Sequence, residues 1–186
     1  KYKKPGKVFL GIVHRLDKPV SGVMLFARTS KAAARLSEQF REGSIEKVYW
    51  AIVEGRVDKP AGTLEDWLRK NPETHRVDVL EPREEGARQS LLHYTRRGMH
   101  GDYSWLEIRP QTGRTHQLRV QLAHHGHPIY GDAKYGSVAT FGDGIALHAR
   151  ALTFLHPVRY EPITLTAELP EEWLDRFLPI LHEAKT

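Results

Sequence analysis

The sequence predicts an α+β domain built on a mixed, largely antiparallel sheet. Short runs rich in aromatic and β-branched residues recur along most of the chain, and several neighbouring runs are close enough to pair as hairpins. Segments with helical periodicity are few, and they do not alternate regularly with the strands. The pattern therefore argues against a parallel βαβ fold.

The N-terminal part of the chain contains two apolar runs and one helix. Residues 8–13 and 22–28 are apolar runs typical of buried strands, and the polar segment between them is predicted to be a loop. Ser30 is predicted to cap a helix that continues to Arg41, with an apolar residue at every fourth position. Gly43 is the expected end of this helix.

The middle of the chain is predicted to be mostly strand. Residues 47–53 are rich in aromatic and β-branched residues, which favours a strand. Residues 62–79 are predicted to hold a hairpin. Residues 89–97 and 103–108 are predicted to pair around a turn at 98–102.

The C-terminal part is predicted to contain two strands and two helices. Thr115 is the expected N-cap of a helix that ends before the next glycine, and strands are predicted at 145–155 and 163–169. Pro170 is predicted to open the last helix, which Pro179 shortens or kinks. Three apolar residues at a spacing of four form its predicted inner face: Trp173, Phe177 and Leu181.

Composition narrows the class of protein. The 186 residues suit one domain, and the absence of cysteine excludes disulfides and thiolate metal sites. No apolar run approaches the roughly 20 residues that a membrane-spanning helix needs. The formal charge of +5 suits a polyanionic partner. We expect a cytoplasmic monomer that does not contact membranes.

A carboxylate among bases marks the loop between the first two strands. Asp17 lies close to His14, Arg15 and Lys18, and catalytic groups often sit on loops held by rigid strands. Nearby cations favour the ionised carboxylate that a nucleophile requires. The alternative is a polar turn with a structural ion pair.

A glycine turn leads directly into the predicted helix after Gly113. Backbone N–H groups at a helix N-terminus attract anions, and Arg114 is suited to pair with a carboxylate or a phosphate. The alternative is a capped helix with solvated arginines.

Three histidines in four positions, at 124, 125 and 127, raise the question of a metal. His116 and His124 are eight residues apart, and no HExxH motif is present. The Gly-X-Pro-Ile stretch that follows favours a tight turn in a pocket wall, so we predict no metal site.

Tyr49 and Trp50 are adjacent in a predicted strand, so their side chains face opposite sides of the sheet. One of them is expected to lie in the core. The other offers a flat face on which a nucleic-acid base can stack, although core packing of both is the alternative.

Together these segments resemble the RluA-type family of RNA pseudouridine synthases. The resemblance rests on four blocks that occur in order over most of the chain: GIVHRLDKPVSGVMLFAR, KVYWAIVEG, RPQTGRTHQLRVQLAHHGHPIYGDAKYG and LHARALTFLHP. It implies the pseudouridine synthase fold, a mixed curved sheet flanked by helices with a central RNA-binding cleft.

The resemblance also implies roles for individual residues. Asp17 is the catalytic carboxylate, Arg15 replaces the flipped base in the RNA, and Tyr49 lines the uracil pocket as a candidate proton acceptor. Arg114 pairs with Asp17, and Leu118 packs against the base. Three neighbours in the same motifs are expected to bind the substrate: His14, Thr115 and His116.

The implied reaction converts uridine to pseudouridine in ribosomal or transfer RNA after the base flips out of its stack. It requires neither cofactor nor metal, and the carboxylate acts either by attack on C1′ or by proton abstraction from the sugar. Residues 1–186 form one catalytic domain in this interpretation, without an S4-type domain and without the strands that usually precede HRLD. Two rivals remain, an RNA-binding module without activity and a metal-dependent hydrolase.

Overall fold

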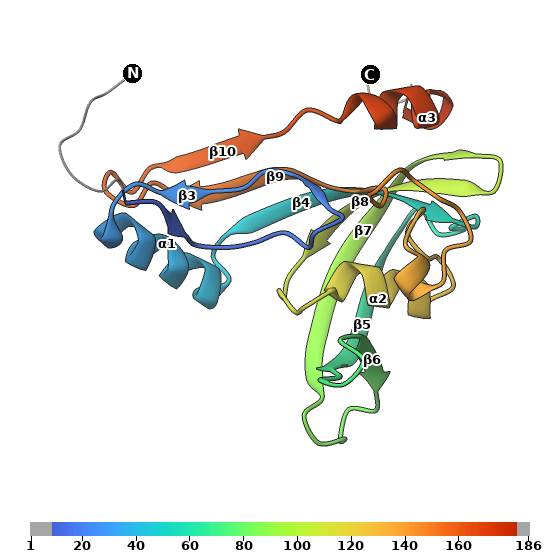
Figure 1. The fold of residues 1–186 in the computed structure, drawn as a ribbon, viewed down its shortest axis with the longest axis horizontal. Helices are drawn as coiled ribbons and strands as arrows, with labels where there is room; N and C mark the ends of the chain where they lie inside the picture. Colours follow the sequence, from blue (N-terminus) through green and yellow to red (C-terminus); the bar gives the residue numbers. More distant parts are fainter. Residues whose placement is uncertain (1–8, 182–186) are drawn as a thin grey trace.

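A computed structural model describes residues 9–181, and within them the chain forms an eight-stranded mixed sheet, a two-stranded sheet and three α-helices (Figure 1). The strands are β1 (Gly11–Ile12), β2 (Ser21–Gly22), β3 (Phe26–Ala27), β4 (Glu46–Glu54), β5 (Ala61–Lys70), β6 (Val77–Leu80), β7 (Arg88–His100), β8 (Tyr103–Pro110), β9 (Leu147–Leu155) and β10 (Pro162–Thr166). The helices are α1 (Ser30–Glu42), α2 (Gln117–His124), the short 3-10 helix η1 (Ala133–Tyr135) and α3 (Glu171–Leu181).

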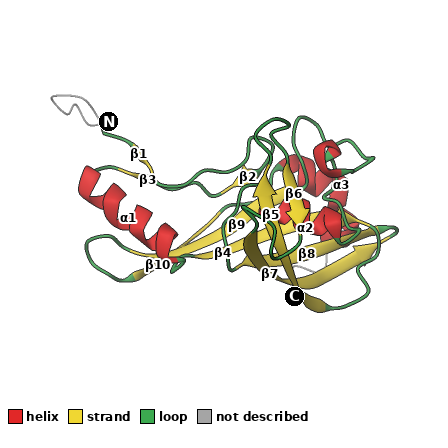
Figure 2. Ribbon diagram, turned by 90° about the horizontal axis from the view of Figure 1, so that it is seen from below, coloured by secondary structure: helices red, strands yellow, loops and turns green. Residues whose placement is uncertain are grey.

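The large sheet has the strand order β10-β9-β4-β8-β7-β5-β6, and all of these neighbours are antiparallel. β2 adds a short parallel pairing to β9. The sheet bends, so that β5 and β7 lie at a steep angle to β9 and β10 (Figure 1). Helix α1 lies near the small β1–β3 sheet (Figure 2). The predicted α+β class with a mixed, largely antiparallel sheet is confirmed.

The core forms where the central strands meet helices α2 and α3. Ile52 on β4, Leu92 on β7 and Ile108 on β8 are fully buried in one cluster with apolar residues of both helices. Trp173 and Phe177 of α3 belong to it and stack edge-on with each other. Burial of such side chains contributes roughly 1.5–3 kcal/mol each, which makes the sheet a rigid support for the loops at its edges.

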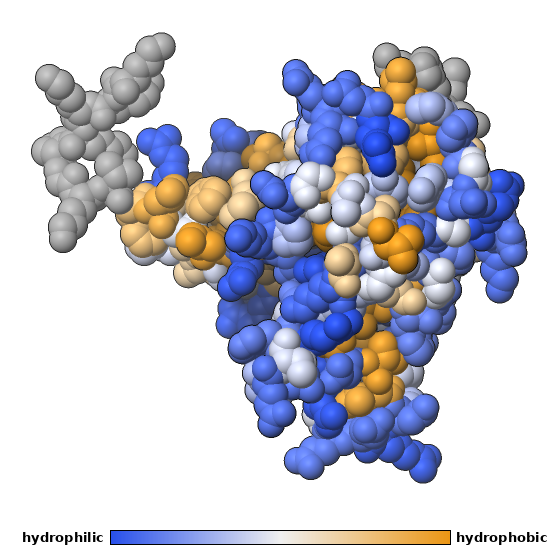
Figure 3. Space-filling view, turned by 45° about the vertical axis from the view of Figure 1, so that its right-hand side comes forward, coloured by the Kyte–Doolittle hydropathy of each residue, from blue (hydrophilic) through white to orange (hydrophobic). Residues whose placement is uncertain are grey.

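The N-terminal strands are shorter than predicted. Of the predicted strand at 8–13, only β1 forms, and Val8 lies outside the described residues. The predicted strand at 22–28 is divided between β2, which pairs with β9, and β3, which pairs with β1. The two apolar runs predict buried strands, but Ile12 in the first run and Phe26 in the second are exposed. Figure 3 shows apolar surface at the end of the molecule that carries these strands.

The predicted N-caps of the first two helices were each wrong by one residue. Thr29, not Ser30, caps α1, because its side-chain oxygen accepts the Ala32 N–H at 3.1 Å; the helix ends at Gly43 as predicted. Helix α2 begins at Gln117 rather than after Thr115, and the residue before it has left-handed backbone geometry without a side-chain cap.

The remaining elements match the sequence analysis with small differences. β5 and β6 form the predicted hairpin, and β7 pairs with β8 around a tighter turn than predicted, because Gly98 stays in the strand at a bulge. Phe177 has non-helical backbone angles two residues before Pro179, so the predicted kink in α3 is confirmed. Among residues 9–181, no helix combines the length and the apolar character required to cross a bilayer.

Gly22 is the point where the chain leaves the loop after β1 and joins the large sheet. Its φ of +122° lies in a region that side chains with a Cβ rarely adopt. A Cβ here would also overlap the backbone of Ala149 on β9. Glycine therefore permits the close approach that fixes this end of the loop.

We expect Gly22→Ala to lower the free energy of unfolding by roughly 3 kcal/mol, because it adds both backbone strain and a clash. Gly43→Ala is the matched control: its φ is +73°, but nothing lies within 4 Å of the added methyl group, so about 1 kcal/mol is expected. Urea denaturation of the two variants measures the difference. Equal losses would show that the contact with Ala149 has no energetic role.

Candidate active site

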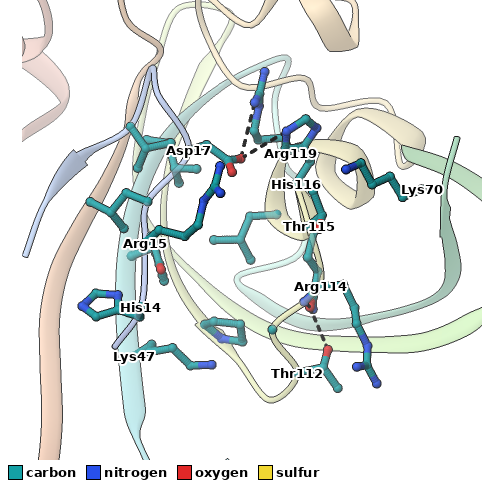
Figure 4. A pocket seen from close by; sticks show the side chains of 18 of the residues that line it. His14, Arg15, Asp17, Lys47, Lys70, Thr112, Arg114, Thr115, His116 and Arg119 are labelled. Carbon is teal, nitrogen blue, oxygen red and sulfur yellow. Dashed lines mark hydrogen bonds and ion pairs between the residues drawn. The ribbon is translucent and has the colours of Figure 1, made fainter. Parts of the chain in front are cut away.

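A pocket of about 570 Å³, here called the main pocket, opens between the loop after β1 and the segment that precedes α2 (Figure 4). Its lining contains one carboxylate, Asp17, and six Lys or Arg side chains. The six are Arg15, Lys47, Lys70, Arg114, Arg119 and Lys134. Such a surface favours an anionic ligand.

The Asp17 loop is fixed at both ends by bonds to distant elements. The Leu25 N–H donates to Nε2 of His14 at 2.9 Å, and the His14 ring stacks on Phe40 of α1. At the other end, the Ile145 N–H donates to the Pro19 carbonyl at 3.0 Å. Asp17 is therefore held by anchors on both sides, although the loop contains no regular structure.

Arg119 of α2 joins Asp17 to a second, buried carboxylate. Its Nε and Nη2 donate to the two oxygens of Asp132 at 2.6 and 2.8 Å, while Nη1 reaches Oδ2 of Asp17 at 3.4 Å. Burial opposes the charge of Arg119, but the bonds to both carboxylates outweigh it and raise its pKa. The bidentate bond to Asp132 fixes the plane of the guanidinium and so directs its third nitrogen at Asp17.

The expected ion pair between Arg114 and Asp17 was wrong. Arg114 is exposed and its Nε donates to the Gln89 carbonyl at 3.3 Å, on another side of the main pocket. Gln117 explains the separation: its Oε1 accepts the N–H of Arg114 and the hydroxyl of Thr112, which closes the turn before α2. Arg119, the third residue of α2, is then the arginine that faces the carboxylate.

His116 lies between Asp17 and a tyrosine. Its φ of +49° is left-handed, its Nδ1 is hydrogen-bonded to the Tyr135 hydroxyl at 2.7 Å, and its Nε2 lies 3.8 Å from Oδ2 of Asp17. Burial lowers the pKa of His116 more than the attraction of Asp17 raises it. The imidazole is therefore neutral at pH 7, and its contact with Asp17 is polar rather than ionic.

Tyr49 and Leu118 line the main pocket from the sheet and from α2. The pairing of β4 with β9 shifts register between Val48 and Tyr49, and such bulges re-aim side chains near sites. Burial, with a smaller contribution from the charge of Asp17, raises the pKa of Tyr49 to about 12. The phenol is thus neutral in the resting protein.

The other predicted residues lie at the rim of the same pocket. Arg15 is exposed and extends into the pocket from the Asp17 loop, and Thr115 is exposed on the opposite wall (Figure 4). His14 also lines the pocket, but its Nε2 is occupied by the bond to the loop backbone. The structure thus gathers all eight predicted site residues around one pocket.

Sequence reasoning missed three residues of this pocket and its support: Arg119, Asp132 and Lys47. The sequence did offer a signal for Arg119, because it is the second arginine of the RTHQLR segment. Lys47 lies two residues before Tyr49 on β4, and burial lowers the pKa of its amine. No pattern in the sequence linked Asp132 to a loop more than a hundred residues away.

Two of the histidines considered as metal ligands lie against the same carboxylate, since Nε2 of His124 is 3.9 Å from Oδ1 of Asp66, which His125 also contacts. Nε2 of His125 lies 3.2 Å from the Asp66 carboxylate, whereas Nδ1 of His127 lies 3.2 Å from the Glu54 carbonyl. Within residues 9–181, no group of three or more potential ligand side chains is arranged to hold a metal ion.

Comparison with known proteins identifies the family of this chain. A family model described as RNA pseudouridylate synthase matches residues 1–124, which is two thirds of the chain. The chain belongs to the RNA pseudouridylate synthase family. The resemblance inferred from the sequence blocks is therefore confirmed.

Curated members of the family include relatives with different RNA targets in their names. A ribosomal large subunit pseudouridine synthase D from Xanthomonas campestris is 38% identical over 93% of this chain and 55% of its own length. A tRNA pseudouridine synthase C from Haemophilus influenzae is 36% identical over 87% of this chain and 74% of its own length. An RNA pseudouridine synthase from Synechocystis is 40% identical over 86% of this chain and 50% of its own length. The chain thus spans about half the length of the first of these relatives.

Solved structures of family members share the fold. Human RNA Pseudouridylate Synthase Domain Containing 4 aligns with a TM-score of 0.76 and 26% identity, over 95% of this chain and 76% of that one. Human RNA Pseudouridylate Synthase Domain Containing 1 aligns with a TM-score of 0.75 and 29% identity, over 87% and 70%. The pseudouridine synthase fold is therefore confirmed.

We expect the stability of the protein to fall as the pH decreases below about 6.5. Burial lowers the pKa of His14, His116 and His148, so the unfolded chain binds protons at a higher pH than the folded one. The stabilisation is complete above the unfolded pKa of about 6.5 and is lost as the pH falls through the folded values. Thermal denaturation between pH 7.5 and 5, with imidazole NMR titrations, measures it. A melting temperature that rises as the pH falls from 7.5 to 5 would contradict the lowered pKa of these histidines.

Proposed function

We propose that this chain is the catalytic domain of an RNA pseudouridine synthase, in which Asp17 is the catalytic carboxylate. The observation that carries the proposal is the position of Asp17, the single carboxylate of a cationic pocket, held by an arginine that is itself fixed by a buried partner. Membership of the family supports the same activity.

The reaction breaks the N1–C1′ bond of uridine, rotates the uracil and rejoins it through C5. Two routes use the carboxylate, attack on C1′ and removal of a proton from the sugar, and both require the ionised form. Arg119 keeps a positive charge 3.4 Å from Asp17 and orients it. In this proposal Arg119 is the positioning residue, in place of Arg114.

The uracil has to leave its stack before it can rotate. The main pocket, at about 570 Å³, has room for a nucleotide. Leu118 and Tyr49 are placed to hold the base by its faces, and Arg15 extends from the rim, where it is placed to fill the vacated stack (Figure 4). The other cations of the rim are placed to contact RNA phosphates, so binding is expected to weaken with salt.

The raised pKa of Tyr49 constrains its role in the last step, in which C5 loses its proton. At a pKa of about 12, only about one phenol in 100,000 is ionised at pH 7. Tyr49 therefore acts as a hydrogen-bonding wall of the uracil pocket. It accepts the C5 proton only if its own proton leaves in the same step.

The relatives indicate the class of RNA that this chain modifies, but not the individual RNA. Their names refer to the large ribosomal subunit and to transfer RNA. Both are structured RNAs with single-stranded loops, in which a uridine flips at low energetic cost. We propose ribosomal or transfer RNA as the substrate of this chain and the cytoplasm as its place of action.

Asp17→Asn is expected to lower the rate of pseudouridine formation at least about 1,000-fold, because an amide neither attacks C1′ nor accepts the sugar proton. RNA affinity should change less than about threefold. The rate is measured as tritium released from transcripts that contain 5-³H-uridine.

Asp58→Asn, in the exposed loop between β4 and β5 and outside the main pocket, is the matched control and should retain full activity. Wild-type protein that binds these RNAs without releasing tritium would instead identify an RNA-binding module. Activity of Asp17→Asn close to that of the wild type would remove Asp17 from the mechanism.

The two arginines of the RTHQLR segment should respond differently. Arg119→Lys keeps the charge but loses the bidentate bond to Asp132, so kcat should fall about 100-fold while KM changes little. Arg114→Gln should raise KM for RNA and leave kcat within about twofold. Steady-state kinetics of both variants decides which arginine positions Asp17. A larger loss of kcat in Arg114→Gln than in Arg119→Lys would restore the sequence-based prediction that Arg114 is the partner of Asp17.

A further inference from the structure

A second pocket of about 360 Å³ adjoins the main pocket and shares four of its lining residues. The shared residues are Lys70, Gly113, Arg114 and Thr115, so the 113–115 segment is a common wall. The rest of the second pocket comes from the end of β5 and the starts of β6 and β7. At the lower end of the molecule in Figure 3, hydrophilic atoms surround an apolar patch.

The charge of the second pocket has one sign. Its nine lining residues include four cations, Arg69, Lys70, Arg88 and Arg114, and no carboxylate. All four are exposed, and within residues 9–181 none of them lies within 4 Å of an acidic group as an ion pair. Four cations around one hollow repel one another unless an anion enters.

Three acidic side chains close in sequence to the lining residues are hydrogen-bonded elsewhere. Oε1 of Glu84 accepts the Glu81 N–H at 2.8 Å, and Oε1 of Glu65 accepts from the Gln89 side chain. Oδ2 of Asp78 accepts from the Asn71 amide at 3.4 Å. These bonds hold the three accepting carboxylates in local turns and strand pairs, and none of the three lines the second pocket.

Two of the arginines are fixed while most of their donors stay available. Arg69 donates from Nη1 to the Glu85 carbonyl at 3.0 Å, and Arg114 donates from Nε to the Gln89 carbonyl. A guanidinium has five N–H donors, so each of these bonds leaves four. A fixed guanidinium loses less entropy when it binds an oxyanion than a free one does.

We infer that the second pocket is an RNA subsite, which holds the phosphodiester backbone next to the uridine in the main pocket. This inference rests on the proposed function. A strand whose base lies in the main pocket has to continue past the 113–115 wall, where Gly113 has no side chain to obstruct it. Buried Leu68 and Val77 also line the second pocket, which therefore offers an apolar surface below the cationic rim.

The test uses the double variant Arg69→Gln/Arg88→Gln, which leaves the main pocket unchanged because neither residue lines it. Its KM for tritium-labelled ribosomal and transfer RNA transcripts should rise at least about tenfold, with kcat within about twofold. Its affinity for a fluorescein-labelled uridine 12-mer should fall, and the slope of log affinity against log salt should decrease by about 1.4, or roughly 0.7 for each lost phosphate contact.

Arg97→Gln is the matched control, because Arg97 lies on β7 nine residues beyond Arg88, or about 30 Å along the strand. It should leave KM and the salt slope unchanged. Unchanged KM and salt slope in the double variant would overturn the subsite, as would a loss confined to kcat. Free inorganic phosphate is titrated in parallel; phosphate binding that the double variant loses, with no change in KM for RNA, would identify a free-anion site instead and also overturn the inference.

The same measurements separate this inference from the proposed function. Wild-type protein that releases no tritium from any transcript refutes the activity and, with it, the subsite as part of that activity. Active wild type with an unaffected double variant refutes the subsite alone. Circular dichroism of the double variant is expected to match the wild type, because both substituted residues are exposed.

Discussion

The site depends on one buried guanidinium shared by two carboxylates. Arg119 connects helix α2 with Asp132 beside η1 and with the loop that carries Asp17. Asp132 is 1% exposed, so loss of the arginine would leave an uncompensated charge in the interior, at a cost of about 3–5 kcal/mol. The same interaction that places the carboxylate in the pocket thus also holds three separate segments of the fold together.

Much of the sheet could be predicted from the sequence because its strands carry their own signal. The aromatic and β-branched run on β4 and the hairpin of β7 and β8 lie close to where they were predicted. The N-terminal apolar run was misleading, because the pattern does not show that Ile12 faces solvent. The start of α2 was also beyond prediction, since Gln117 closes the preceding turn with its side chain.

For the site, the sequence blocks predicted which residues line the pocket, but they did not predict which of these residues contact one another. The eight predicted site residues, which come from three of the four sequence blocks, all line one pocket. The partner of Asp17 was assigned to the wrong arginine, because a sequence does not state which of two arginines five positions apart faces a loop. Gln117 separates Arg114 from the carboxylate by closing the turn before α2, and the buried Asp132 fixes Arg119 in its place.

The anchors of the Asp17 loop have a consequence for synthesis on the ribosome. Ser21 is hydrogen-bonded to His148 at 2.8 Å across 127 positions, and Pro19 accepts from Ile145. These contacts of long sequence separation form late, because their loop-closure entropy has to be overcome first. At about 5–20 residues per second, the loop waits seconds for its partners to emerge. The loop that carries Asp17 therefore reaches its final position only after the start of β9 has been made.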